Sequence, residues 1–269
     1  MNMHDQAHSA PTRESLVAAL RKREFSMHYQ PQLSCRTARV AGAEALMRWH
    51  SAERNGPVSP ASFIPLAEQS GFIVELGDWS MASALRMMAA WRDEARLPAD
   101  FRLAINLSRR QIVPELPGKV ERLIAQAGLE PSCVELEITE SYLFHDLPTM
   151  VEVTRQLRKL GVRVAIDDFG TGFSVLEHLR HIPATTIKID CSFTRQMLEI
   201  ERDHIIMRNL IRMVRDLGME SVCEGVETMA QLEAVKDMGA DYWQGFLFSP
   251  ALPGAEFRGL LDAPGMDLR

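Results

Sequence analysis

Side chains that could bind a metal ion or transfer a proton recur along this sequence at nearly regular intervals. Successive members of the series are separated by 62, 31, 30, 21, 36 and 20 residues, and a βαβ unit takes about 30 residues. The series consists of Glu44, Asn106, Glu137, Asp167 with Asp168, Lys188, Glu224 and Gln244. One carboxylate at a strand end is commonly just an exposed terminus, but a recurrence on successive strands predicts a shared site.

These side chains would crowd negative charge into one place. With Glu227 and Arg48 added, six carboxylates face two cations. Crowding of this kind shifts pKa values and destabilises a fold, and two divalent cations would cancel it. The donors are carboxylates and one amide, with no histidine or cysteine pair nearby, so the set predicts Mg²⁺ or Mn²⁺ rather than Zn²⁺.

The adjacent residues Asp167 and Asp168 constrain the backbone. Alternate residues of a regular strand point to opposite faces, so both carboxylates reach one site only if the strand ends there. Gly170 and Gly172 supply such a break. We therefore expect the strand to end at this pair.

The apolar periodicity predicts strands that alternate with helices along the whole chain. Helical segments end at Gly128, Gly161, Gly218 and Gly239, where a left-handed cap is expected. The eight predicted strands are 26–33, 39–46, 101–107, 133–138, 162–167, 185–190, 221–224 and 242–248. This alternation indicates a mainly parallel sheet.

The connection between the first two strands decides the architecture. Residues 34–38 are too few for a parallel crossover, which needs a dozen or more residues, so this pair must be an antiparallel hairpin. The sequence therefore predicts an α/β fold, a (β/α)8 TIM-like barrel with one antiparallel strand in the N-terminal hairpin. In such a barrel the carboxyl ends of the strands meet at one mouth, where active sites lie.

Composition excludes several other classes of protein. Hydrophobic residues make up 46% and charged residues 25%, as in globular domains, and the net charge of −6 provides no basic face for duplex nucleic acid. No apolar run approaches the roughly 18 residues of a membrane span. The scattered cysteines form no CxxC pair, which predicts reduced thiols and a cytoplasmic protein. We expect a disordered tail at 1–13 and one domain at 14–269.

The tripeptide Glu44-Ala45-Leu46 resembles the signature of the EAL domains, a family of phosphodiesterases that cleave cyclic di-GMP. Seven further motifs follow the family pattern in order over roughly residues 15 to 255. They are Tyr29-Gln30-Pro31, Ile105-Asn106-Leu107-Ser108, Glu137-Ile138-Thr139-Glu140-Ser141, Asp167-Asp168-Phe169-Gly170-Thr171-Gly172, Lys188-Ile189-Asp190, Glu224-Gly225-Val226-Glu227-Thr228 and Gln244-Gly245. No family ligand position is altered.

The resemblance implies a role for each position. The first metal would be held by Glu44, Asn106, Glu137 and Asp167, and the second by Asp167 and Asp168. Glu224 would be the general base or a ligand of the metal that carries the water, and Lys188 would orient that water. Substrate contacts would come from Gln30, Leu46, Arg48, Asp190 and Gln244, with support from Glu140 and Glu227.

The implied reaction is hydrolysis of cyclic di-GMP to linear pGpG, which lowers the level of this second messenger. It would use Mg²⁺ or Mn²⁺, with two ions in each active site, because a phosphodiester is itself anionic. The resemblance also implies a homodimer.

Several alternatives stay open at the level of sequence. Glu140 could anchor the loop 168–174 rather than bind metal, and Lys188 could be a plain ion-pair partner. The protein could be a receptor that binds cyclic di-GMP without cleaving it. From architecture alone, it could be an enolase-type lyase that removes a proton next to a carboxylate.

Overall fold

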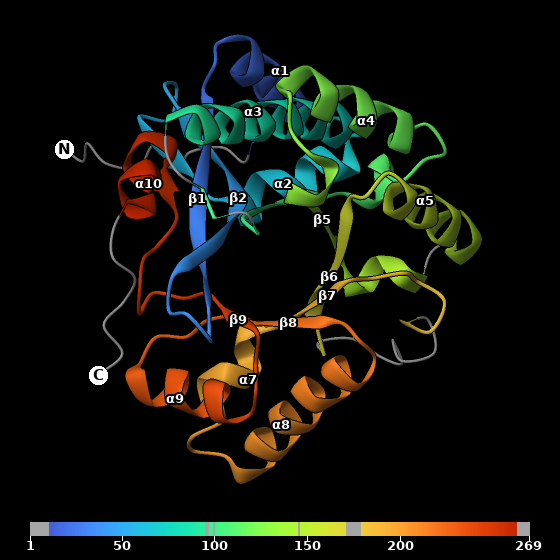
Figure 1. The fold of residues 1–269 in the computed structure, drawn as a ribbon. Coiled ribbons are helices and arrows are strands. Elements are labelled where there is room, and N and C mark those ends of the chain that lie inside the picture. Colours follow the sequence, from blue (N-terminus) through green and yellow to red (C-terminus); the bar gives the residue numbers. More distant parts are fainter. Residues whose placement is uncertain (1–10, 95–96, 99, 145, 171–178, 263–269) are drawn as a thin grey trace, which may run out of the picture.

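The computed structural model describes residues 11–94, 97–98, 100–144, 146–170 and 179–262. In these residues a ring of strands closes on itself and helices cover its outside (Figure 1). The predicted (β/α)8 barrel is confirmed. We call the end at the carboxyl termini of the parallel strands the mouth, and the opposite end the floor.

Eight strands form the barrel wall. β2 and the six strands β4 to β9 are parallel to one another, and β1 runs antiparallel between β9 and β2. The wall strands are β1 (Phe25–Ser34), β2 (Val40–Ser51), β4 (Arg102–Leu107), β5 (Val134–Thr139), β6 (Arg163–Phe169), β7 (Thr186–Ile189), β8 (Glu220–Cys223) and β9 (Tyr242–Trp243). The predicted antiparallel hairpin is therefore β1–β2, and its register places Gln30 opposite Glu44.

Two features of the sheet correct the prediction from sequence. The last wall strand ends at Trp243 rather than at Phe248, because the chain turns at Gly245 to pack against the backbone of Val226. Two short antiparallel strands, β3 (Gly56–Val58) and β10 (Leu252–Pro253), extend β2 and β1 and were not predicted.

Helices and short 3-10 turns connect the strands. The helices are α1 (Arg13–Arg21), α2 (Pro60–Gln69), α3 (Ile73–Glu94), α4 (Leu116–Ala127), α5 (Leu147–Lys159), α7 (Cys191–Gln196), α8 (Glu201–Asp216), α9 (Met229–Asp237) and α10 (Gly254–Leu261), and the 3-10 turns are η1 (Arg109–Gln111), η2 (Pro131–Cys133) and η3 (Glu140–Phe144). Gly128, Gly161, Gly218 and Gly239 all have positive φ, as the capping prediction required. α1 starts at Arg13, where Thr12 caps it, one residue before the expected domain boundary.

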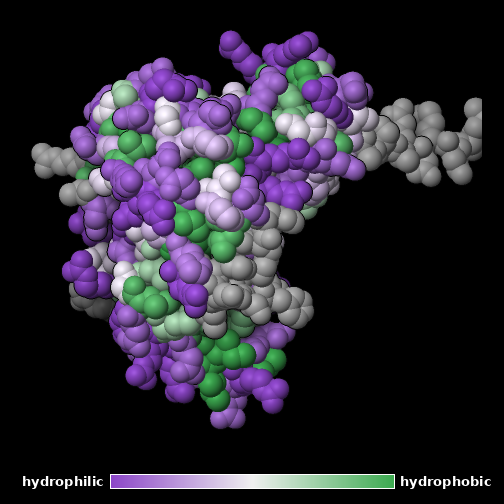
Figure 2. All heavy atoms as spheres, turned by 90° about the vertical axis from the view of Figure 1, so that its right-hand side faces the viewer, coloured by the Kyte–Doolittle hydropathy of each residue, from purple (hydrophilic) through white to green (hydrophobic). Residues whose placement is uncertain are grey.

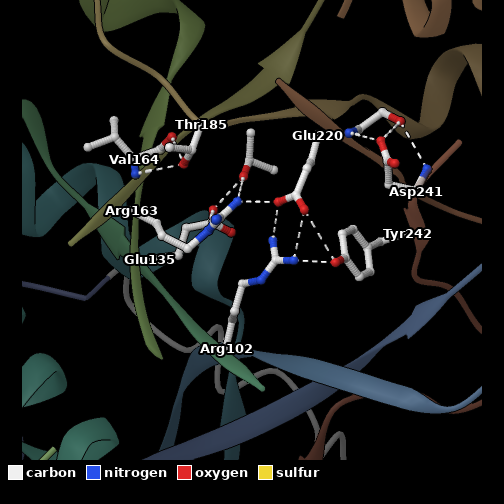
Figure 3. A network of polar contacts seen from close by, with 10 residues as sticks. Arg102, Glu135, Arg163, Val164, Thr185, Glu220, Asp241 and Tyr242 are labelled. Atoms are coloured by element: carbon white, nitrogen blue, oxygen red, sulfur yellow. Dashed lines mark hydrogen bonds and ion pairs between the residues drawn. The ribbon is translucent and has the colours of Figure 1, made fainter. Parts of the chain in front are cut away.

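A network of polar and charged side chains lies at the floor (Figure 3). Arg102 at the start of β4 lies 2.6 Å from Glu220 at the start of β8. Arg163 at the start of β6 bonds both Glu220 and the buried Glu135 of β5. The Arg102 guanidinium also lies over the ring of Tyr242, 4.5 Å from its centroid. These contacts join five strands that are far apart in the sequence.

Apolar side chains fill the layer between the wall and the helices, and they also reach the surface near α8. Figure 2 shows this side of the molecule as mainly hydrophilic, with hydrophobic groups gathered toward the bottom, at the height of α8 in Figure 1. Ile205 and Ile206 of α8 are exposed, as are Leu198 and Ile200 just before it. Within the described residues, no helix combines the length and the apolar character needed to cross a bilayer.

Candidate metal-binding active site

The predicted series of polar side chains converges at the mouth of the barrel. Asn106, Glu137 and Asp167 lie within the last residues of β4, β5 and β6, while Glu224 and Gln244 directly follow β8 and β9. Side chains alternate along a strand, so residues two or four positions apart point to the same face. Each of these five residues therefore shares the inward face with a floor residue of the same strand. The floor residues are Arg102, Glu135, Arg163, Glu220 and Tyr242. The parallel register thus explains why residues spread over two hundred positions meet.

Lys188 of β7 lies at the centre of this group. Its side chain is 1% exposed, and its Nζ is 3.2 Å from Glu44, 3.0 Å from Glu137, 2.9 Å from Asp167 and 2.9 Å from Glu224. Burial opposes the charge of the ammonium, but the surrounding carboxylates raise the pKa of Lys188 well above its ordinary value. The lysine is therefore a fixed cation at neutral pH.

Amide side chains orient Glu44, which lies within β2. Asn106 Nδ2 donates to Glu44 Oε1 at 2.9 Å, and Gln244 Nε2 donates to Glu44 Oε2 at 2.7 Å. Burial alone would favour the neutral acid, yet Lys188 and the two amides lower the pKa of Glu44. Gln244 Nε2 also lies 3.2 Å from Glu224 Oε1, so this amide links the two carboxylates.

Glu137, Glu224 and Asp168 are held in an environment that disfavours their charge. Burial and the charge of Glu44 raise the pKa of Glu137 well above its ordinary value. Burial, with Asp167 and Glu44 adding to it, raises the pKa of Glu224 to about 8, although Lys188 acts in the opposite direction. Burial and the neighbouring Asp167 raise the pKa of Asp168 to about 6. The single positive charge of Lys188 therefore does not balance the negative charge of the clustered carboxylates.

The arrangement of oxygens fits two cations. One carboxylate oxygen each from Glu44, Glu137 and Asp167 lie within 4.8 Å of one another, and so do those of Asp167, Asp168 and Glu224. Among the described residues, Glu137 Oε2 has no donor, and Glu137 Oε1 and Asp167 Oδ1 have none apart from the Lys188 ammonium. Lys188 Nζ lies 3.0 Å from Glu137 Oε1 and 2.9 Å from Asp167 Oδ1, but it is shared with Glu44 and Glu224, so four carboxylates face one ammonium. A cation coordinated by these oxygens would offset the cost of burying them without enough donors.

The backbone at Asp168 explains how two adjacent aspartates serve one site, and it corrects the expected strand end. β6 continues to Phe169, but its register with β7 shifts between Ile166 and Phe169, and Asp168 has a φ of +55°. Such a bulge turns successive side chains to the same side. Gly172, the other residue expected to break the strand, lies outside the described residues.

Glu140 contacts the backbone next to the cluster and belongs to neither of the two carboxylate groups. It begins η3 just beyond β5, is 2% exposed, and its Oε2 accepts a hydrogen bond from the Gly170 backbone N–H at 2.6 Å. Gly170 follows the bulge by two residues, so the contact holds the segment that carries Asp168. The rest of the loop that Glu140 was expected to anchor, residues 171–174, is outside the described residues.

The remaining predicted residues lie around the cluster, and their surroundings differ. Leu46 and Arg48 lie on the same face of β2 as Glu44 and line, with Asn106, a cavity of about 280 Å³ beside the cluster. Gln30 lies opposite Glu44 in the β1–β2 register. Asp190 caps α7 through a 2.9 Å bond to the Ser192 backbone. The Glu227 side chain is exposed and has no hydrogen bond or ion pair within the described ranges.

Sequence reasoning missed the carboxylate that closes the outer wall of the same cavity. Glu68 of α2 accepts hydrogen bonds from Ser108 Oγ at 2.8 Å and from Tyr142 Oη at 2.6 Å. Ser108 lies two residues after Asn106, and Tyr142 lies two residues after Glu140. That spacing was the available signal, but nothing near Glu68 in the sequence identified it as their acceptor.

A comparison with known families identifies the family of this chain. The model of the EAL domain matches residues 13–251. The chain therefore belongs to the EAL domain family.

Curated relatives include two proteins of Pseudomonas aeruginosa. The bifunctional diguanylate cyclase/cyclic di-GMP phosphodiesterase MucR is 37% identical over 242 residues, which are 90% of this chain and 35% of the relative. The cyclic di-GMP phosphodiesterase NbdA is 37% identical over 258 residues, 94% of this chain and 32% of the relative. The chain thus spans about a third of these relatives.

Solved structures show the same architecture. The PaMucR phosphodiesterase in complex with c-di-GMP superposes with a TM-score of 0.85 at 36% identity, covering 91% of this chain and 98% of that one. The EAL domain of Mycobacterium smegmatis DcpA gives a TM-score of 0.75 at 33% identity, covering 90% and 97%.

Proposed function

We propose that this protein is a metal-dependent phosphodiesterase that hydrolyses cyclic di-GMP to linear pGpG. The observation that carries the proposal is the pair of carboxylate groups that share Asp167 around the buried Lys188. Its support is the EAL family membership, together with relatives and a solved complex whose names specify this nucleotide.

We propose two Mg²⁺ or Mn²⁺ ions as cofactors. Glu44, Asn106, Glu137 and Asp167 would hold one ion, and Asp167 with Asp168 would hold the other. When bound, such ions neutralise the phosphodiester and lower the pKa of a coordinated water. The all-oxygen donor set and the unsatisfied Oε2 of Glu137 support hard cations.

The chain's own residues would place the reactants. Glu224 lies beside Asp168 and Lys188, where its carboxylate can take a proton from the attacking water. Lys188 holds Glu224 and Asp167 in fixed positions and favours the anionic form of that water. The water adds to phosphorus, the P–O3′ bond breaks, and the 3′ oxygen leaves with a proton.

We propose that substrate contacts come from the residues around the mouth. Arg48 can pair with a phosphate oxygen, and Gln30, Leu46 and Asp190 lie on the strands or strand ends that border the site. Gln244 bonds Glu44 and Glu224, which supports an orienting role in addition to any substrate contact. Glu227 stays a proposed supporting residue.

Glu140 is proposed as a support for the second ion rather than a ligand. Its hydrogen bond from the Gly170 backbone supports this choice between the two alternatives. A carboxylate that fixes the backbone beside a metal ligand affects metal affinity indirectly.

The proposal extends to the assembly and location of the protein. The exposed apolar residues Leu198, Ile200, Ile205 and Ile206 support a homodimer, because a second copy would remove them from water. The mass of the protein in light scattering tests this. The free cysteines support a cytoplasmic, reducing environment.

The direct test is incubation of the purified protein with cyclic di-GMP and Mg²⁺, followed by chromatographic separation of nucleotides. We expect linear pGpG to accumulate. Binding of the nucleotide without any product would instead establish a receptor. An unchanged nucleotide with no binding would contradict both functions.

A further inference from the structure

Glu68, on the outer side of the barrel mouth, joins three segments of the chain. It lies in the last turn of α2, and its Oε1 accepts hydrogen bonds from Ser108 Oγ at 2.8 Å and Tyr142 Oη at 2.6 Å. Ser108 follows β4, and Tyr142 lies in η3 after β5. A single oxygen thus connects α2 with the loops of two neighbouring strands.

The first of these loops carries a residue of the metal cluster. Ser108 is two residues after Asn106, and it is 7% exposed. Ser108 caps η1: its Oγ accepts from the Arg110 backbone N–H, and its own N–H donates to Gln111 Oε1. Because the Ser108 hydroxyl proton is donated to Glu68, the cap and the carboxylate fix this turn together. The position of Asn106, which orients Glu44, depends on that turn.

The second loop carries the support of the bulged strand. Tyr142 is two residues after Glu140 in the same 3-10 turn, and Glu140 accepts the hydrogen bond from Gly170. A shift of η3 would therefore move the carboxylate that holds the backbone next to Asp168. Glu68 lies at the outer end of this chain of contacts and does not reach the cluster itself.

We propose that Glu68 is a positioning residue, which braces the β4 and β5 loops against α2 and thereby sets the geometry of both metal positions. The expected effect on activity rests on the proposed function. The contacts of Glu68 with the two loops do not depend on that function. An ionised carboxylate suits the role because hydrogen bonds to a charged acceptor are roughly twice as strong as neutral ones.

Two variants separate charge from contact. Glu68→Ala removes both hydrogen bonds and leaves two hydroxyl groups without their acceptor, while Glu68→Gln keeps an acceptor of the same length without its charge. Glu75→Ala is the matched control, because Glu75 is an exposed residue of α3 with no hydrogen bond or ion pair in the described part of the chain.

The first measurement is Mg²⁺ dependence. For Glu68→Ala we expect the Mg²⁺ concentration at half-maximal activity, and the Mn²⁺ dissociation constant from calorimetry, to rise about 10-fold, the lower end for residues that support metal ligands. Saturating Mg²⁺ should restore most of the turnover. Glu68→Gln should show a smaller rise, and Ser108→Ala combined with Tyr142→Phe should match Glu68→Ala.

The second measurement does not depend on metal or activity. In metal-free protein, amide hydrogen exchange in segments 106–111 and 140–144 should become faster in Glu68→Ala and stay unchanged in Glu75→Ala. Faster exchange in a protein that cleaves nothing would contradict the proposed function but keep the bracing. Unchanged exchange, or a lower melting temperature with parental Mg²⁺ dependence, would overturn the role of Glu68.

Discussion

The two ends of this barrel solve the burial of charge in opposite ways. At the floor, Arg102 and Arg163 face Glu135 and Glu220, so the charges balance and the pairs are closed by direct contacts (Figure 3). At the mouth, one lysine faces five carboxylates, whose members include acceptors without donors. The same strands carry both ends.

This difference separates stability from function along each strand. The floor is complete as the chain folds, because each buried charge has a partner of opposite sign. The mouth is incomplete, and its raised carboxylate pKa values indicate that the bare site is electrostatically unfavourable. Added cations would complete it, so changes at the mouth should alter activity and metal affinity, whereas changes at the floor should alter folding.

The largest expected effect is that of metal removal. Excess EDTA should abolish hydrolysis of cyclic di-GMP, because the mouth then lacks the charge that neutralises the phosphodiester. Mg²⁺ or Mn²⁺ should restore turnover, and Ca²⁺ should restore little because its longer and looser coordination positions water poorly. Product formation is followed by chromatography. Full activity in EDTA would contradict the proposed two-metal site.

Removal of the proposed base comes next. Glu224→Gln should keep the fold and lower turnover by at least about 10²-fold, the lower range for loss of a general acid or base. Glu233→Gln, at an exposed position of α9, is the control and should retain parental turnover. Steady-state kinetics at saturating Mg²⁺ measures both variants. Near-parental turnover in Glu224→Gln would remove this residue from the chemistry.

Loss of the loop support should have an intermediate effect. Glu140→Ala should weaken Mg²⁺ affinity and activity by about 10 to 100-fold, the range for residues that position a metal ligand. The lost contact is the bond from the Gly170 backbone, so raising Mg²⁺ should recover part of the turnover. A titration of Mg²⁺ against activity measures this. No recovery, together with a crystal structure showing Glu140 on the cation, would make it a ligand.

At the floor the same kind of change should act on stability alone. Arg163→Met leaves the buried Glu135 without its ion pair, and should lower the free energy of unfolding by about 2 to 3 kcal/mol, below the cost for a fully enclosed pair since Arg163 is 21% exposed. Arg155→Met, which breaks an exposed pair with Glu152, is the control and should change little. Urea unfolding measures both. Lower turnover per folded molecule would contradict the separation of the two ends.

The smallest expected effect is a pH dependence confined to the metal-free mouth. The pKa of Glu224 is about 8 and that of Asp168 about 6 in the folded chain, above their ordinary values, so the folded state binds more protons than the unfolded state. Metal-free protein should therefore lose stability as pH rises from about 5 to 8.

Glu224→Gln should flatten this slope, since the amide does not titrate, and melting temperatures in EDTA at each pH measure it. Saturating Mg²⁺ should flatten the slope as well, because the cation offsets the same charges. A metal-free parent that becomes more stable over this pH range would contradict the account of the mouth.

Local patterns in the sequence determined much of this architecture. The short connection before Arg39 required the β1–β2 hairpin, and the glycines at 128, 161, 218 and 239 marked helix ends that the structure confirms. The polar residues at strand ends were identified in the same way, because strand periodicity and the spacing of βα units are properties of short stretches of chain. The barrel then brings such ends together whatever the residues between them.

Only the tertiary structure decided which of these groups touch and how each is oriented. Strand register and side-chain direction place four carboxylates around Lys188 and pair Arg102 with Glu220, 118 residues away. They also bring the hydroxyl groups of two loops to Glu68, which accepts a hydrogen bond from each. The bulge at Asp168 replaced the expected strand end, because its left-handed backbone depends on the neighbouring strand. Long-range contacts leave no periodic trace in a sequence, since any of many charged residues could satisfy each one until the fold selects its partner.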